Sequence, residues 1–144
     1  MSKTVLILNG PNLNLLGRRE PDIYGHDTLG DIRMMCAAHA GNLGLETDFR
    51  QSNHEGVLID WIQEAMDGFG AVILNAAGYT HTSIAIHDAL KALTCPIFEV
   101  HLSDPETRES FRHHSYVGLV AQARFTGQGA KGYLLALDAA AQVL

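Results

Sequence analysis

The chain opens with the stretch Thr4-Val5-Leu6-Ile7-Leu8-Asn9-Gly10-Pro11-Asn12, in which four apolar residues run into a polar loop. Residues 5–8 have the unbroken apolar character of a strand that is buried on both faces of a parallel sheet. The loop continues to His26 and carries several asparagines, two adjacent arginines and Tyr24. Loops of this length without secondary structure are uncommon in compact domains and usually act as lids or binding segments. The opening therefore predicts a central strand that leads into a functional loop.

Strand and helix patterns alternate along the rest of the chain. Ala71 to Asn75 is again apolar until its last residue, as expected of another central strand. Thr28 is a suitable N-cap for a helix that ends before Gly44, and Thr82 or Ser83 can cap a later helix. The predicted strands are 4–9, 45–51, 71–75, 97–101 and 119–125, and the predicted helices are 28–43, 56–66, 82–93, 104–112 and 131–144.

This alternation predicts an α/β fold with a parallel sheet and helices on both of its faces. Five strands in this length favour a flavodoxin-like, doubly wound arrangement with the strand order 2-1-3-4-5. Ligands bind such sheets at the carboxyl ends of the strands, near the point where the order reverses. The polar residues Asn9, Asn75 and His101 all end predicted strands, so they collect where the fold predicts a site.

Size and charge narrow the class of protein. A chain of 144 residues with 47% hydrophobic content fits a single globular domain, 1–144. The net charge of −6 argues against nucleic acid as a partner, and no apolar run is long enough to span a membrane. We expect a cytoplasmic protein, because Cys36 and Cys95 form no disulfide framework and no signal peptide is evident.

The arginines suggest a small anionic ligand. They outnumber the lysines, and the planar guanidinium can bond both oxygens of a carboxylate. Four of them fall in predicted loops or at loop edges, at Arg18, Arg19, Arg108 and Arg112. Taken alone, each is better explained by solvated surface charge.

Two groups suggest proton transfer. A cation fixed beside a phenol favours the phenolate, so an arginine near Tyr24 makes the loop a candidate proton-abstracting device. Histidine can donate or accept a proton near neutral pH, and His101 lies at the carboxyl edge of the sheet. Strand alternation places Glu99 on the same side as His101, where its carboxylate could orient the ring.

Other site classes fit less well. The eight histidines include no His-Glu-x-x-His motif and no paired cysteines, so a zinc site is not favoured. The glycine pattern at 127–132 follows the last strand and leaves no room for a second strand, so it predicts a tight turn, not a dinucleotide site. A response regulator needs an aspartate at the end of its third strand, where this chain has Asn75. A flavin site would rest on fold analogy alone.

Several separated blocks resemble the type II 3-dehydroquinate dehydratases and span most of the chain. The blocks are Leu8-Asn9-Gly10-Pro11-Asn12-Leu13, Gly17 with Arg19-Glu20-Pro21 and Tyr24-Gly25, Ser52-Asn53-His54-Glu55-Gly56, Asn75 to His81 with His87-Asp88-Ala89, Glu99-Val100-His101-Leu102-Ser103, and Arg108-Glu109 with Phe111-Arg112. The resemblance implies loss of water from 3-dehydroquinate to give 3-dehydroshikimate through an enolate, in the shikimate or quinate pathway. It implies no metal and no cofactor.

The resemblance also implies roles for individual residues. Tyr24 would remove a proton beside the ketone, Arg19 would keep Tyr24 ionised, and His101, oriented by Glu99, would protonate the departing hydroxyl. Asn12 would help hold a water against the enolate oxygen. The substrate-binding residues would be Asn75, His81, Asp88, Leu102, Ser103 and Arg112, with Asp88 reaching in from a neighbouring subunit.

The family assembles as dodecamers built from trimers, so the resemblance implies a homododecamer. The chain departs from the family pattern at Asp104-Pro105, which bears on subunit contacts and not on the chemistry. Arg18 precedes Arg19, so the family spacing alone decides which of the two faces Tyr24. A catalytically silent protein that binds a polyol acid in the same fold is the alternative, and the presence of both Tyr24 and His101 argues against it.

Overall fold

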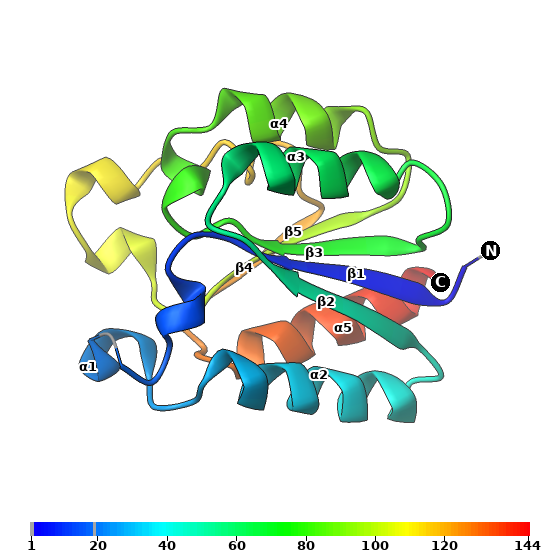
Figure 1. Ribbon diagram of the computed structural model, residues 1–144, viewed down its shortest axis with the longest axis horizontal. Helices are drawn as coiled ribbons and strands as arrows, with labels where there is room; N and C mark the ends of the chain where they lie inside the picture. Colours follow the sequence, from blue (N-terminus) through cyan, green and yellow to red (C-terminus); the bar gives the residue numbers. More distant parts are fainter. Residues whose placement is uncertain (1, 19) are drawn as a thin grey trace.

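Five parallel strands in the order β2-β1-β3-β4-β5 form the central sheet (Figure 1). This confirms the predicted fold class and strand order. The computed structural model describes residues 2–18 and 20–144. The strands are β1 (Thr4–Asn9), β2 (Glu46–Gln51), β3 (Ala71–Asn75), β4 (Ile97–His101) and β5 (Ala123–Thr126).

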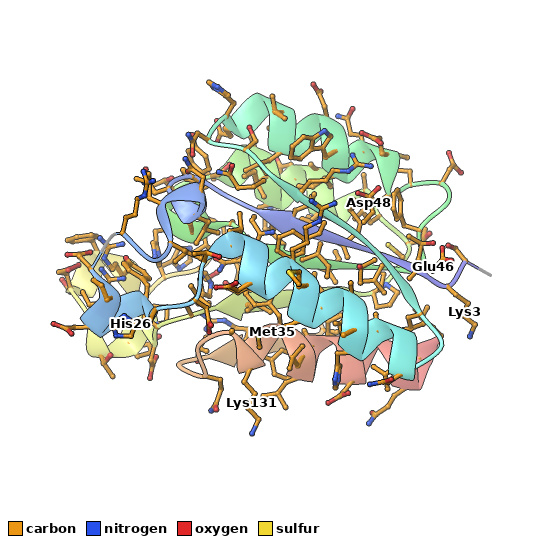
Figure 2. All side chains as sticks on the ribbon, turned by 60° about the horizontal axis from the view of Figure 1, so that its bottom comes forward. Lys3, His26, Met35, Glu46, Asp48 and Lys131 are labelled. Atoms are coloured by element: carbon orange, nitrogen blue, oxygen red, sulfur yellow. The ribbon has the colours of Figure 1, made fainter. Side chains whose placement is uncertain are left out.

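Two pairs of helices cover the sheet, one pair on each face (Figure 1). On one face α2 (Leu29–Asn42) packs beside α5 (Lys131–Val143), as Figure 2 shows from that side. On the other face α3 (Glu55–Glu64) packs against α4 (Ile84–Lys91). None of the helices described here is both long and apolar enough to cross a membrane.

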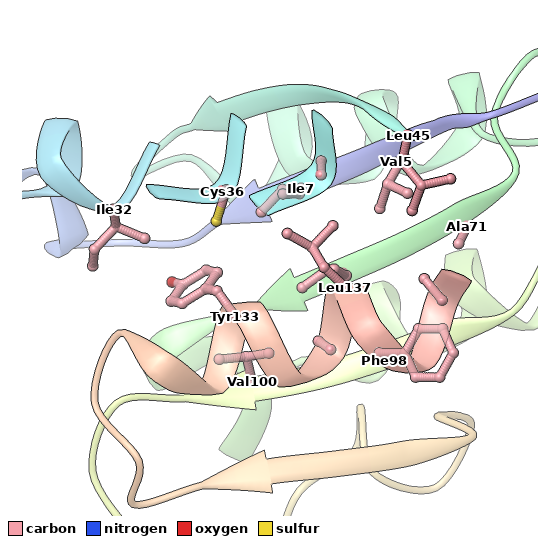
Figure 3. Close-up of a cluster of buried hydrophobic side chains, with 14 of the residues drawn as sticks. Val5, Ile7, Ile32, Cys36, Leu45, Ala71, Phe98, Val100, Tyr133 and Leu137 are labelled. Carbon is pink, nitrogen blue, oxygen red and sulfur yellow. The ribbon is translucent and has the colours of Figure 1, made fainter. Parts of the chain in front are cut away.

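The core lies in two layers, one on each face of the sheet. Alternate residues of β1 serve both layers, with Val5 and Ile7 on the α2–α5 side and Leu6 and Leu8 on the α3–α4 side. Every residue of β3 and β4 is buried, whereas β2 and β5 are mostly half-buried, as expected of edge strands. Figure 3 shows the first layer, in which Tyr133 of α5 packs with its ring inside the cluster.

Helix α2 has the predicted limits because both of its ends are capped. The Asp31 N–H donates to Thr28 Oγ1, while the Thr28 N–H donates to the Asp31 carboxylate, so two free donors of the first turn are satisfied reciprocally. At the other end Gly44 has φ +74°, the left-handed conformation that follows many helix ends.

The loop after β1 contains more structure than predicted. It holds a short 3-10 helix, η1 (Leu13–Leu15), and a single helical turn, α1 (Pro21–Tyr24). Leu13 and Leu16 are buried in the core, and this burial folds the loop onto the body of the protein. The prediction of a loop without secondary structure is therefore wrong.

The predicted helix 104–112 is also wrong, because the segment forms two 3-10 turns. These are η3 (Pro105–Thr107) and η4 (Ser110–Arg112). Asp104 caps the first turn, and Arg108 after it has extended backbone angles that interrupt the helix. The segment has little apolar periodicity to hold a longer helix, since Phe111 is exposed.

The fifth strand begins later than predicted. Residues 116–120 form a turn, and the N–H groups of Val120 and Ala121 both bond to the Val117 carbonyl. Val117 is buried in the α3–α4 layer, and Leu119 is exposed. The apolar residues that suggested a strand therefore pack as a turn, and pairing with β4 starts only at Ala123.

The ends of β1 and β3 approach each other closely at Gly10. Its N–H donates to the Asn75 carbonyl at 2.8 Å. A Cβ atom at Gly10 would lie 2.4 Å from the carbonyl oxygen of Ala76. This position accepts no side chain unless the two main chains separate.

We predict that Gly10→Ala lowers the free energy of unfolding by at least about 2 kcal/mol, because the methyl group would meet rigid main chain. Chemical denaturation measures the change. Gly41→Ala, in α2 with open space around it, is the matched control and should stabilise by up to about 1 kcal/mol. Equal stability of the two variants would contradict the close approach.

Candidate active site

A pocket of about 210 Å³ opens at the carboxyl ends of β1, β3 and β4. It lies where the order of the strands reverses, as the fold predicts. The residues that line it include eight of the predicted site residues, namely Asn12, Tyr24, Asn75, His81, His101, Leu102, Ser103 and Arg112.

The loop after β1 forms one wall of this pocket. Asn12 has a left-handed backbone with φ +70°, and its N–H donates to Asn53 Oδ1 at 3.0 Å. Tyr79 donates its hydroxyl hydrogen to the Asn53 carbonyl. The segment before α3 thus links the loop after β1 to the loop after β3. Tyr24 ends α1 and faces the same pocket.

Among the described residues, Arg108 places a cation beside Tyr24. An Nη1–H of Arg108 donates to the Tyr24 hydroxyl oxygen at 2.9 Å, and the guanidinium carbon lies 5.2 Å from the centre of the ring. The bend between η3 and η4 brings Arg108 to this position. A guanidinium at this distance stabilises negative charge on the phenol oxygen.

The Glu99–His101 pair forms another wall. His101 Nε2 lies 2.6 Å from Glu99 Oε2, so the two side chains lie on the same side of β4, as strand alternation predicts. Since Nε2 is engaged by the carboxylate, Nδ1 is the ring nitrogen that can serve the pocket. The ring of His81 stacks near that of His101, with 6.5 Å between their centres.

Glu99 is fully buried and remains charged. Burial raises the pKa of a carboxyl group, but the hydrogen bond and charge of His101, with Ser115 and Arg124, outweigh burial and hold the pKa of Glu99 at about 2. Glu99 is therefore an anion throughout the neutral range.

His81 serves as a neutral ring. Its Nδ1–H donates to the His114 carbonyl at 2.8 Å, which leaves Nε2 as an acceptor. Burial, aided by the positive charges of His101 and Arg112, lowers the pKa of His81. Arg112 is itself held by Glu109, whose carboxylate accepts from the Arg112 Nε–H. The pocket thus offers a hydrogen-bond acceptor beside a fixed guanidinium.

Asn75 is held from below by Tyr133. The Tyr133 hydroxyl accepts from Asn75 Nδ2 at 3.0 Å and donates to Asn9 Oδ1 at 2.6 Å. Burial raises the pKa of Tyr133, so this phenol keeps its proton. Asn75 Oδ1 accepts from the Ala77 N–H, which fixes the loop after β3.

Leu102 and Ser103 continue β4 into the pocket. Their carbonyl groups accept from the N–H groups of Gly129 and Gly127, so the turn before α5 holds this segment in place. The predicted tight turn at 127–132 is therefore confirmed, and both of these glycines have positive φ.

Two predicted residues stand apart from this assembly. Asp88 lies on α4, is exposed and pairs with His87, so it is outside the pocket of its own chain. The prediction for Arg19 lies outside the described residues. Within the described part of the chain, no group of three or more His, Cys, Asp or Glu side chains could hold a metal ion.

Sequence reasoning missed residues that the tertiary structure brings to the site. The sequence marks Arg108 as a loop arginine within a family block but gives it no role, and its contact with Tyr24 depends on the break between η3 and η4. Ser115 and Arg124 bond to Glu99, but Ser115 lies outside the predicted elements and Arg124 is predicted only as a strand residue. The pocket therefore combines a phenol, an imidazole on a buried carboxylate and two arginines, which suits proton transfer on a small anion.

Comparisons with known proteins agree with this chemistry. Residues 3–141 match the family model described as dehydroquinase class II. The 3-dehydroquinate dehydratase of Phenylobacterium zucineum is 59% identical over 98% of this chain and 97% of its own. That of Caulobacter vibrioides is 56% identical over 97% of this chain and 96% of its own. A crystal structure of type II dehydroquinase from Propionibacterium acnes superposes with a TM-score of 0.94 at 45% identity, covering 99% of this chain and 98% of that one.

Ala77 is strained beside this pocket, because its φ is +52°. An alanine in the left-handed region costs roughly 1–2 kcal/mol relative to its ordinary conformations, whereas glycine adopts that region freely. We predict that Ala77→Gly raises the free energy of unfolding by about 0.5–1 kcal/mol, after the added entropy of the unfolded chain is counted. Thermal unfolding measures the gain. Ala37→Gly, on the exposed side of α2, should instead lose up to about 1 kcal/mol, and a loss at both positions would show that Ala77 carries no strain.

Proposed function

This chain belongs to the class II dehydroquinase family, and we propose that it removes water from 3-dehydroquinate to give 3-dehydroshikimate. The protein is a hydro-lyase and acts through an enolate intermediate. The observation that carries the proposal is that Tyr24 and His101 line one pocket, with a cation beside the first and a buried carboxylate behind the second. The site thus holds one group suited to accept a proton and another suited to donate one.

Tyr24 removes the proton from the carbon beside the ketone. The electrons of the broken C–H bond pass into the enolate, and the phenolate takes the proton. The hydrogen bond from Arg108 supports this role, because a guanidinium favours the ionised phenol. The family resemblance gives Arg19 the same function.

Asn12 holds a water against the enolate oxygen. Its backbone is fixed by Asn53, so this donor is in place before charge develops. Collapse of the enolate then breaks the bond between carbon and the departing hydroxyl. His101 gives its Nδ1 proton to that hydroxyl, and water leaves. Glu99 keeps the ring oriented throughout.

The remaining polar groups hold the substrate. Arg112 binds its carboxylate together with the Leu102–Ser103 segment, and Asn75 and His81 bind its hydroxyl groups. Support comes from their shared pocket, from the neutral acceptor at His81 and from the fixed guanidinium of Arg112. A positively charged pocket suits an anion even though the chain carries a net charge of −6.

Assembly completes the proposal. The exposed position of Asp88 on α4 suits a residue that enters the site of a neighbouring subunit. We propose that residues 1–144 form one catalytic domain and that twelve copies assemble as a homododecamer, a tetramer of trimers. We also propose that the enzyme works in the cytoplasm, in the shikimate pathway.

We predict that Tyr24→Phe lowers kcat by at least about a hundredfold, because it removes the proposed base. The conjugated product absorbs in the ultraviolet, so turnover is followed directly. Calorimetry should show that 3-dehydroquinate still binds. Tyr116→Phe removes a phenol outside the pocket and is the matched control. A Tyr24→Phe protein with parental kcat would refute this role for Tyr24.

Arg112→Ala should mainly weaken substrate binding, since it removes a charge-assisted contact with the carboxylate. KM should rise about ten- to a hundredfold with a smaller change in kcat. The exposed Arg33 on α2 supplies the control, and Arg33→Ala should leave both constants unchanged. A loss confined to turnover at saturating substrate would show that Arg112 is no anchor.

A further inference from the structure

The buried carboxylate of Glu99 is shared between two cations on opposite sides. Oε2 accepts from His101 at 2.6 Å, whereas Oε1 accepts from the Nε–H of Arg124 at 2.5 Å. His101 lines the pocket, but Arg124 lies on β5, outside the residues that line it. The proposed mechanism uses only the first of these cations.

Two hydroxyl groups complete the surroundings of Oε2. Ser115 Oγ lies 2.5 Å from it and Thr80 Oγ1 lies 3.0 Å from it. The two hydroxyls are 2.6 Å apart, and Ser115 Oγ also accepts from the Gly118 N–H. This pattern fits a chain in which Thr80 donates to Ser115 and Ser115 donates to Glu99.

The turn at residues 116–120 lies close to the other carboxylate oxygen of Glu99, Oε1. A Cβ atom at Gly118 would lie 3.1 Å from Glu99 Oε1 and 3.3 Å from Arg124 Nε. The close approach of this turn leaves Arg124 and Glu99 little room to separate. The side chain of Arg124 is 36% exposed at its outer side, while Glu99 is fully buried.

We propose that Arg124 is a positioning residue that shares the charge of Glu99 and so allows His101 to release its proton. The inference rests on the proposed function, because it concerns the acid step of the dehydration. Arg124 itself touches neither the pocket nor the substrate.

The charge balance of the acid step gives the reason. Before the step, Glu99 is paired with both the imidazolium and the guanidinium. The Nδ1 proton then passes to the oxygen whose bond to carbon breaks, and the ring becomes neutral while Nε2–H still donates to Glu99. At that point Arg124 keeps the buried anion paired with a positive charge. Without such a partner, a buried carboxylate would be strongly destabilised.

Without Arg124 the whole negative charge would act on the imidazolium, which would hold its proton more tightly. Other titratable or charged groups of the described residues that line the pocket with His101 are His81, which stacks with its ring, Arg108 and Arg112. These three residues form hydrogen bonds with other partners, whereas Arg124 bonds Glu99 directly.

The test compares Arg124→Met and Arg124→Lys with the parent protein. In Arg124→Met, NMR of the His101 ring without substrate should show its titration midpoint raised by about one pH unit. The kcat at neutral pH should fall about tenfold, and the pH above which kcat declines should rise by the same interval. Arg124→Lys should restore both values most of the way, and a His101→Asn spectrum assigns the resonance.

Arg50→Met provides the matched control. Arg50 also bonds two carboxylates, but these are Asp48 of β2 and Glu64 of α3 and not Glu99. It should lower stability and leave the His101 titration unchanged. An Arg124→Met protein that loses only stability, with an unchanged titration midpoint of His101 and an unchanged pH profile of kcat, would overturn the inference.

If the parent protein itself failed to turn over 3-dehydroquinate, the proposed function would fail, while the titration of His101 would still decide the role of Arg124.

Discussion

The burial of one charged carboxylate, Glu99, constrains the rest of the site. An unpaired ion of this kind would destabilise the fold by several kcal/mol. The Glu99 carboxylate accepts hydrogen bonds from His101 on the same strand and from Arg124 on the neighbouring strand. The hydroxyl groups of Thr80 and Ser115 also bond to it. The partners that stabilise the charge therefore also set the orientation of the imidazole, and stability and chemistry cannot be separated here.

A second constraint comes from the connections that follow β1 and β3, which are neighbours in the sheet. The chain continues from β1 to α2 on one face and from β3 to α4 on the other, and the pocket lies at the ends of these strands. Three buried side chains bridge the strand ends from below, because Tyr133 bonds to both Asn9 and Asn75. Helix α5 thus supports the floor of the pocket although it contributes little to its lining. Figure 3 shows the Tyr133 hydroxyl at the edge of an otherwise apolar cluster.

Local patterns predicted much of this molecule. The strands at 4–9, 71–75 and 97–101 follow from apolar continuity, and α2 follows from Thr28 and Gly44. The Glu99–His101 pair follows from strand alternation. Such features depend on neighbours in the sequence, and these are the predictions that the structure confirms.

The errors fall where distant contacts decide the conformation. Val117 packs into the α3–α4 layer, so residues expected in a strand form the turn that carries Ser115 and Gly118 to Glu99. The break at Arg108 turns one arginine toward Tyr24, and no local signal marks it. Arg124 is predictable as a strand residue but not as a partner of a buried carboxylate, because strand pairing supplies that contact. The role given to Asp88 depends on a second subunit, which no local pattern describes.

The orientation of His101 is the claim on which the chemistry depends, and nitrogen-15 NMR of labelled histidine tests it most directly. The spectra distinguish which ring nitrogen carries the proton in the neutral form. With Glu99 bonded to Nε2, the neutral ring should keep its proton on Nε2, and the proton gained or lost on titration should be the one on Nδ1. A neutral ring protonated on Nδ1, with Nε2 titrating, would contradict the account.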